Sequence, residues 1–272
     1  TRMDYDPLGR KVRMDDPSMG HWEYRYDAAG NLVWQKDAQG QELTFQYDAL
    51  NRLVRKGAGL QTLAEYGYDQ GPWGSGRRTG MTDTSGVTTW GYDARGRLVQ
   101  EARTLSGVGT FTTGWGYDAA GRAVRQVYPD GEMVNTTYNL RGLPTAVVGQ
   151  NAYLTGATYN ALGQPLQQTW GNTRVTTYAY HPQSLRLTQL QVSSNLLDLR
   201  YGYDRVGNIT AITDTVNSNQ VQTFGYDARE RLTWARTNAA GSGQYHEAYS
   251  YDRMGNILTR TGSGQAVAYV YG

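Results

Sequence analysis

The sequence contains no cysteine and only three phenylalanines among its 272 residues, and its content of charged residues is low. Without cysteine there is no disulfide framework, and nothing in the sequence reports the redox compartment. Charged residues make up 18% of the chain, and 26 basic residues against 24 acidic ones leave a net charge of +2. We therefore expect neither nucleic acid nor a membrane surface as a partner, and neither a coiled coil nor a highly charged disordered segment.

Long hydrophobic runs are also missing. No apolar segment approaches the roughly 20 residues that a membrane-spanning helix needs. The residues that follow Thr1 lack the basic, apolar and small-residue order of a signal peptide. These absences predict a soluble chain that is part of a longer polypeptide.

Tyrosine and glycine are abundant, at 22 and 34 residues, and the tyrosines recur at a regular spacing of 20 to 25 residues. The repeat tyrosines are Tyr5, Tyr26, Tyr47, Tyr68, Tyr92, Tyr117, Tyr138, Tyr159, Tyr180, Tyr203, Tyr226, Tyr251 and Tyr271. Fixed spacing of this kind is typical of repeat proteins. We therefore interpret residues 1–272 as a single array of about twelve units, a fragment of a longer repeat region.

Large rings alternate with small or polar residues before each repeat tyrosine. The residue two positions earlier is aromatic in ten of the thirteen units: Tyr24, Phe45, Tyr66, Trp90, Trp115, Tyr178, Tyr201, Phe224, Tyr249 and Tyr269. A period of two is typical of a strand, because alternate side chains lie on opposite faces. We expect these rings to pack against one another from unit to unit, edge to face or offset.

A hairpin loop is expected directly after each repeat tyrosine. The first loop residue is Asp6, Asp27, Asp48, Asp93, Asp118, Asp204, Asp227 or Asp252, and its carboxylate can accept a backbone N–H two residues later. Glycine follows four residues after the tyrosine, as Gly9, Gly30, Gly96, Gly121, Gly142, Gly163, Gly207 and Gly255. Glycine suits this place because the residue after a type I turn adopts positive φ. Asn51 is the next best residue there, whereas Glu230 predicts a strained or altered loop.

A returning strand and a second turn complete each unit. Second turns are expected at residues 37–40, 83–86 and 129–131, with longer versions at 104–110 and 239–243. Pro144 and Pro165 follow the first turn and predict an edge, a bulge or a loop, since proline cannot donate to a ladder. The insert at residues 70–76, which contains Trp73, is expected to project and to contact other parts of the assembly. Two strands per unit give about 24 strands, so the fold class is all-β, an antiparallel meander that coils or spirals.

The run Tyr92-Asp93-Ala94-Arg95-Gly96-Arg97-Leu98, with its counterpart beginning at Tyr117, resembles the YD repeat of the Rhs family. That family comprises bacterial Rhs polymorphic toxins, the B and C components of insecticidal toxin complexes, and the teneurins. The resemblance implies a segment of a hollow β-shell, with the remainder of the shell and an enclosed C-terminal toxin domain as partners. It also implies a secreted or extracellular bacterial toxin or effector. The segment with paired aspartates that ends many such shells has no counterpart after Val270.

The repeated residues could also have a chemical function in place of this structural one. The histidines, His21, His181 and His246, stand at different phases of the repeat, so no recurrent general base is expected and the chain is interpreted as non-enzymatic. Asp27 and Asp48 suggest acid–base chemistry or a calcium site if their turns stack, but a residue repeated in every unit favours turn capping. We expect no catalytic residue, metal or cofactor.

Two alternatives to the shell remain open. The aromatic columns also suggest a carbohydrate-binding repeat, and the family's extracellular members suggest an adhesion module. The glycosylation sequons at Asn135 and Asn208 are too short to decide between these. Independently of function, an open array has two unpaired edge strands, which predicts self-association.

Overall fold

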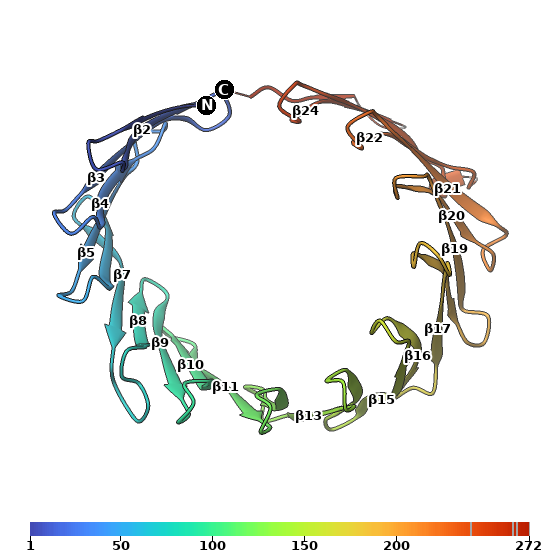
Figure 1. Ribbon diagram of the computed structural model, residues 1–272, viewed down its shortest axis with the longest axis horizontal. Coiled ribbons are helices and arrows are strands. Elements are labelled where there is room, and N and C mark those ends of the chain that lie inside the picture. Colours follow the sequence, from blue (N-terminus) through green and yellow to red (C-terminus); the bar gives the residue numbers. More distant parts are fainter. Residues whose placement is uncertain (240, 263, 265, 272) are drawn as a thin grey trace. The chain divides into compact units, whose positions relative to one another are not determined.

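The computed structural model describes residues 1–239, 241–262, 264 and 266–271 (Figure 1). These residues form 25 strands and one short 3-10 helix, η1 (Gly241–Gly243). Within them, no helix has the length and hydropathy that crossing a bilayer requires. The chain divides into two compact units, Thr1–Val134 with Tyr271, and Asn135–Val270.

The first unit is built from short strands of four to nine residues. They are β1 (Arg2–Tyr5), β2 (Lys11–Asp16), β3 (Gly20–Tyr26), β4 (Leu32–Lys36), β5 (Glu42–Tyr47), β6 (Leu53–Ala58), β7 (Gln61–Tyr68), β8 (Arg78–Asp83), β9 (Gly86–Tyr92), β10 (Leu98–Leu105), β11 (Gly109–Tyr117) and β12 (Ala123–Val127). Each strand from β1 to β11 pairs antiparallel with the next strand in the sequence.

The second unit continues the same pattern. Its strands are β13 (Met133–Tyr138, of which residues 135–138 belong to this unit), β14 (Pro144–Val148), β15 (Ala152–Tyr159), β16 (Pro165–Trp170), β17 (Val175–Tyr180), β18 (Leu187–Val192), β19 (Leu197–Tyr203), β20 (Ile209–Asp214), β21 (Gln220–Tyr226), β22 (Leu232–Thr237), β23 (His246–Tyr251), β24 (Ile257–Thr261) and β25 (Val267–Ala268). Each strand from β13 to β24 again pairs antiparallel with its successor. The all-β prediction of tandem antiparallel hairpins is confirmed.

Neither unit has a conventional hydrophobic core. In the described residues, the only apolar side chains that are buried are Met14, Ala64, Leu154 and Ala235, and no large side chain is fully buried. The accessible surface is 17154 Å², whereas a compact protein of this mass would expose about 11,700 Å². Each unit is therefore a single layer of sheet in which strands contact their sequence neighbours (Figure 1). Stability must come from the joints between successive hairpins, as in other repeat proteins.

The hairpin register shifts at the repeat tyrosines. Tyr26 lies opposite Leu32 while Arg25 lies opposite Trp34, so one residue of the returning strand bulges out. The same shift pairs Tyr138 with Pro144 and Tyr159 with Pro165. The prolines therefore stand at bulges, as predicted, where a missing N–H costs the ladder least.

Second turns lie at the expected places after β4, β8 and β12. The longer turn expected at residues 104–110 is wrong, because Thr104 pairs with Thr110 and Leu105 with Gly109. The extra residues lengthen β10 and β11 instead, and the hydroxyls of the two threonines hydrogen-bond at 2.8 Å. The turn expected at 239–243 includes residue 240, which lies outside the described residues.

Candidate functional site: the repeated Tyr-Asp loops

The loop that follows each repeat tyrosine is closed by its first residue. In the first loop, Oδ1 of Asp6 accepts the backbone N–H groups of Leu8 at 3.0 Å and Arg10 at 2.9 Å. Oδ2 of Asp6 accepts Nε of Arg10 at 2.7 Å. The backbone adds two more bonds, from Asp6 N–H to the Arg10 carbonyl and from Gly9 N–H to the Asp6 carbonyl. One carboxylate therefore fixes both the bend and the arginine that follows it.

The same arrangement recurs with small changes of partner. Oδ2 of the aspartate binds an arginine side chain four residues later at Asp48, Asp93, Asp118 and Asp227. It binds an asparagine side chain instead at Asp27, Asp204 and Asp252. Where aspartate is replaced, Asn139 and Asn160 accept the same two backbone N–H groups through Oδ1, and His181 accepts from Gln183 and Ser184 through Nδ1.

These hydrogen bonds keep the loop carboxylates ionised. The side chain of Arg231 and its backbone N–H lower the pKa of Asp227 to about 2. The pKa of Asp6 is lowered mainly by the backbone N–H of Arg10, and that of Asp93 mainly by the Arg97 side chain. Asp27 and Asp48 each bind within their own loop. In the described part of the chain, no three histidine or acidic side chains gather closely enough to hold a metal ion.

The glycine position has positive φ in the loops where the sequence predicts it. The values run from 75° at Gly96 to 118° at Gly207, and the eight glycines are Gly9, Gly30, Gly96, Gly121, Gly142, Gly163, Gly207 and Gly255. Asn51 and Glu230 adopt the same conformation, with φ of 59° and 62°. The Glu230 loop keeps the usual bond from its N–H to the Asp227 carbonyl. Of the two expected outcomes, the loop is therefore strained rather than altered.

Ten of the repeat tyrosines reach back to the preceding hairpin. The Tyr26 hydroxyl donates to the Lys11 carbonyl at 2.9 Å, and the Tyr47 hydroxyl donates to the Leu32 carbonyl at 2.9 Å. The same bond is made by Tyr68, Tyr92, Tyr117, Tyr159, Tyr180, Tyr203, Tyr226 and Tyr251. The acceptor is each time the residue at the register shift, where a bulge disrupts the ladder. Tyrosine therefore joins one hairpin repeat to the next through its hydroxyl group.

Arginine makes a second joint in the opposite direction. Arg231 donates from Nη1 to the Asp252 carbonyl of the next loop at 3.0 Å, and its guanidinium lies 4.5 Å from the centre of the Tyr251 ring. Arg97 does the same to Asp118 and Tyr117, and Arg10 to Asp27 and Tyr26. This arginine stands in the repeat motif, but the sequence pattern alone predicts no role for it. Its signal was recurrence five residues after the tyrosine, at Arg10, Arg52, Arg97, Arg122 and Arg231.

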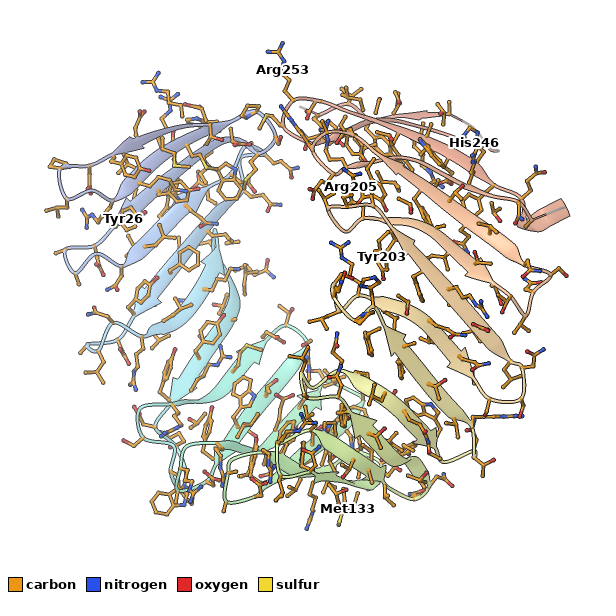
Figure 2. The ribbon with its side chains drawn as sticks, turned by 45° about the vertical axis from the view of Figure 1, so that its right-hand side comes forward. Tyr26, Met133, Tyr203, Arg205, His246 and Arg253 are labelled. Carbon is orange, nitrogen blue, oxygen red and sulfur yellow. The ribbon has the colours of Figure 1, made fainter. Side chains whose placement is uncertain are left out.

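The expected packing of ring on ring from unit to unit is wrong. Among the described residues the one stacked pair is Trp22 with Tyr24, which lie on the same strand, with centroids 6.3 Å apart. Equivalent strands of successive units are two strand spacings apart, about 9.6 Å, which exceeds the roughly 4.5–7 Å that ring pairs need. Arginine and lysine fill that distance, as when Arg78 lies over both Tyr66 and Trp90. Figure 2 shows Tyr26 and Tyr203 on the sheet, with Arg253 extending away from its loop.

The fold and its repeated joints define the class of protein, a tandem β-hairpin array in which tyrosine, aspartate, glycine and arginine each hold one place. A family model described as RHS Repeat matches residues 26–62, 73–108 and 203–242. These matches support the resemblance of the chain to the Rhs/YD-repeat family.

Known proteins of toxin systems resemble the chain. Double-stranded DNA deaminase toxin A of Burkholderia cenocepacia (strain H111) is 31% identical over 121 residues, which are 38% of this chain and 8% of that protein. The crystal structure of TcdB2-TccC3 superposes with a TM-score of 0.83 at 21% identity, over 96% of this chain and 16% of that one. A Tc holotoxin pore of Photorhabdus luminescens superposes with a TM-score of 0.81 at 20% identity, over the same shares. The chain therefore spans a small part of each relative and shares the fold of the Tc structures.

Proposed function

We propose that this chain is a wall segment of an Rhs-type β-shell that encloses a toxin or effector domain for delivery. The observation that carries the proposal is the double joint between successive hairpins, tyrosine to the bulge carbonyl and arginine to the next loop. Such joints extend a single layer of sheet unit by unit without a core. A layer of this kind suits a wall, because both of its faces stay available to whatever lies on either side.

A role as a wall segment also implies a domain organisation, a set of partners and an absence of catalysis. Residues 1–272 act as one array, and its partners are the rest of the shell and the enclosed domain. The array itself catalyses nothing, since its repeated carboxylates are engaged in their own loops. Secretion as part of a bacterial toxin is supported by the relatives, one of which is a deaminase toxin and another a Tc holotoxin.

The carbohydrate-binding and adhesion alternatives stay predictions. A sugar site on the repeat tyrosines would need their hydroxyls and ring faces. In most described units the hydroxyl is bonded to a backbone carbonyl, and several rings are covered by a guanidinium. These contacts favour the structural role for the tyrosines.

Protease protection tests the enclosure. The native polypeptide that carries the array is treated with proteinase K, and survival of its toxin or effector domain is followed by mass spectrometry. We expect that domain to survive under conditions that digest it once it is separated from the array. A variant with Tyr47→Phe and Tyr226→Phe should lose part of this protection, whereas Tyr5→Phe, whose hydroxyl contacts Met3 Sδ, should not. Equal digestion with and without the array would disprove enclosure.

A further inference from the structure

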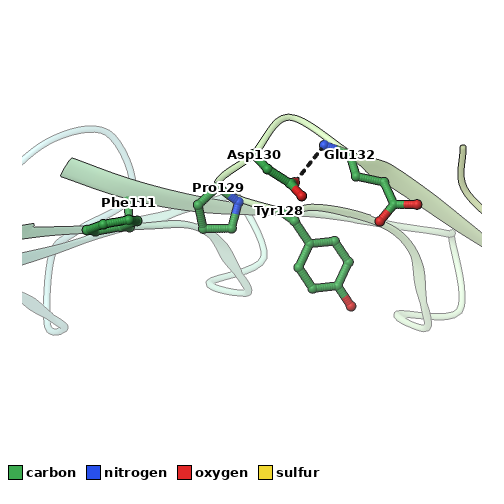
Figure 3. A pocket seen from close by; sticks show the side chains of 5 residues that line it. All are labelled: Phe111, Tyr128, Pro129, Asp130 and Glu132. Carbon is green, nitrogen blue, oxygen red and sulfur yellow. Dashed lines mark hydrogen bonds between the residues drawn. The ribbon is translucent and has the colours of Figure 1, made fainter. Parts of the chain in front are cut away.

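Two exposed rings of the first unit lie outside the repeat columns. Phe111 lies near the start of β11, and Tyr128 directly follows β12. The exposed fractions of their side chains are 43% and 40%. Together with Pro129, Asp130 and Glu132 they line a shallow cavity of about 420 Å³ (Figure 3). Neither ring takes part in a joint between hairpins, so the wall function gives them no role.

The turn at this site, residues 128–132, is ordered by its own hydrogen bonds before any ligand binds. Tyr128 N–H donates to the Glu132 carbonyl at 2.8 Å, and Gly131 N–H donates to the Tyr128 carbonyl at 2.9 Å. Oδ1 of Asp130 accepts the Glu132 N–H at 3.0 Å. Hydrogen bonds therefore fix the turn that brings one carboxylate into the cavity lined by the two rings, and a ligand would not have to order it.

The chemistry of the site is that of the repeat joints with one component missing. In those joints an arginine is bound by an aspartate and covers a tyrosine ring, as Arg231 does with Asp227 and Tyr251. In the described residues, no cation is recorded over Phe111 or Tyr128, and none is paired with Asp130. One candidate of the same chain, Arg103, lies opposite Phe111 across the strands but donates to the Ser85 hydroxyl at 3.2 Å.

We propose that the Phe111–Tyr128 cavity binds an arginine side chain presented by a partner polypeptide. The guanidinium lies against the exposed rings and donates hydrogen bonds to the carboxylate of Asp130. Negative charge beside two aromatic faces is complementary to a planar cation. Arginine fits better than lysine because its planar guanidinium can stack on a ring and hydrogen-bond a carboxylate at the same time.

The test uses the whole chain, labelled with ¹⁵N, and the peptide acetyl-Gly-Arg-Gly-Arg-Gly-amide. We expect saturable shifts of the amides of Thr112, Asp130 and Gly131, with a dissociation constant in the millimolar range. The same peptide with citrulline in place of arginine keeps the shape and loses the charge, and it should bind at least about tenfold more weakly. Equal binding of the two peptides, or an absence of shifts at these amides, would overturn the proposal.

Variants locate the site on the protein. Asp130→Asn and Tyr128→Leu should each raise the dissociation constant about threefold to tenfold. Asp83→Asn is the matched control, because it removes a carboxylate from a second turn of the same unit that contains no aromatic residue. It should leave the dissociation constant unchanged. If neutral oligosaccharides shift these amides and the arginine peptide does not, the site belongs to a sugar and the proposal is wrong.

Discussion

At the scale of single residues, each member of the Tyr-Asp-x-x-Gly-Arg motif performs one task that its chemistry suits. Aspartate accepts two backbone N–H groups and one side chain, and glycine supplies positive φ. Arginine spans from its own loop to the next. Departures from the motif are therefore informative, and Glu230 is the clearest, because it keeps a conformation with φ of 62° that disfavours a Cβ.

Glu230→Gly should stabilise the protein. Relief of the left-handed conformation outweighs the extra entropy of glycine in the unfolded chain, and we expect a gain of about 0.5–1 kcal/mol. Chemical denaturation followed by circular dichroism measures it. The controls are Gly30→Ala, at φ of 90°, and Gly156→Ala, which lacks positive φ; an added Cβ meets nothing within 4 Å at either place. Only Gly30→Ala should destabilise, and equal effects of the two would contradict the assignment of strain to φ.

Arg231→Lys separates shape from charge in the arginine joint. Lysine keeps the positive charge but loses the planar group that bonds Asp227, reaches the Asp252 carbonyl and covers Tyr251. We expect the pKa of Asp227 to rise from about 2 toward its ordinary value. Carbon-13 NMR of the side-chain carboxyl groups follows this titration. Arg253→Lys, in the next loop, should leave the Asp227 titration unchanged, and an unchanged titration in Arg231→Lys would refute the joint.

At the scale of elements, a single hairpin of this protein cannot be stable alone. Isolated two-stranded hairpins are marginal in water, and these bury almost no large side chain. What stabilises a hairpin is its neighbour, through the ladder and through the tyrosine hydroxyl that bonds to the bulge carbonyl. The bulge is therefore part of the joint, because it places a carbonyl where the hydroxyl of the next unit can reach it.

Tyr226→Phe removes one such hydroxyl and leaves the ring. The Ile209 carbonyl loses the hydroxyl that donates to it at 2.9 Å, which should lower the free energy of unfolding by about 1 kcal/mol. Native-state hydrogen exchange at β20 and β21 should report the loss locally. Tyr5→Phe is the matched control, since Tyr5 is 57% exposed and its hydroxyl contacts only a thioether. The tyrosine joint is refuted if the amides of β20 and β21 are as well protected from exchange in both variants as in the wild type.

At the scale of the whole molecule, a chain without a core depends on many equivalent polar contacts. Carboxylates with lowered pKa recur from Asp6 to Asp252, so protonation acts on many loops together. Because their pKa is lower folded than unfolded, they stabilise the fold above about pH 4, the unfolded value. This stabilisation is lost as the pH falls through the folded values, of which Asp227 reaches about 2.

The melting temperature should therefore change little from pH 7 to about 4.5 and fall steeply between pH 4 and 2. Thermal melts followed by circular dichroism test this. His21, whose pKa is raised by hydrogen bonds to Asp15 and then Glu23, titrates at higher pH and acts in the opposite direction, since it stabilises the fold when protonated. Asp227→Asn should shrink the acid loss slightly. A melting temperature that falls as much between pH 7 and 5 as below pH 4 would contradict the prediction.

Most of the fold could be predicted because its signals are local. Alternation before Tyr26, aspartate at the turn and glycine at positive φ act within about ten residues, and the repeat shows each of them many times. The contacts between units could not be predicted in the same way. Ring packing was expected for Tyr66 and Trp90, but strand spacing keeps equivalent rings apart and Arg78 lies over both. The role of arginine was visible only as recurrence.

The sequence by itself determined the hairpins and most of their turns, because these depend on periods of two, on turn chemistry and on the conformational freedom of glycine. Only the tertiary structure decided what joins them. The tyrosine hydroxyl finds its acceptor about 15 residues earlier, at a carbonyl exposed by a register shift. It also decided that Phe111, Tyr128 and Asp130 share one cavity, because a residue pattern cannot tell which side chains a turn brings together.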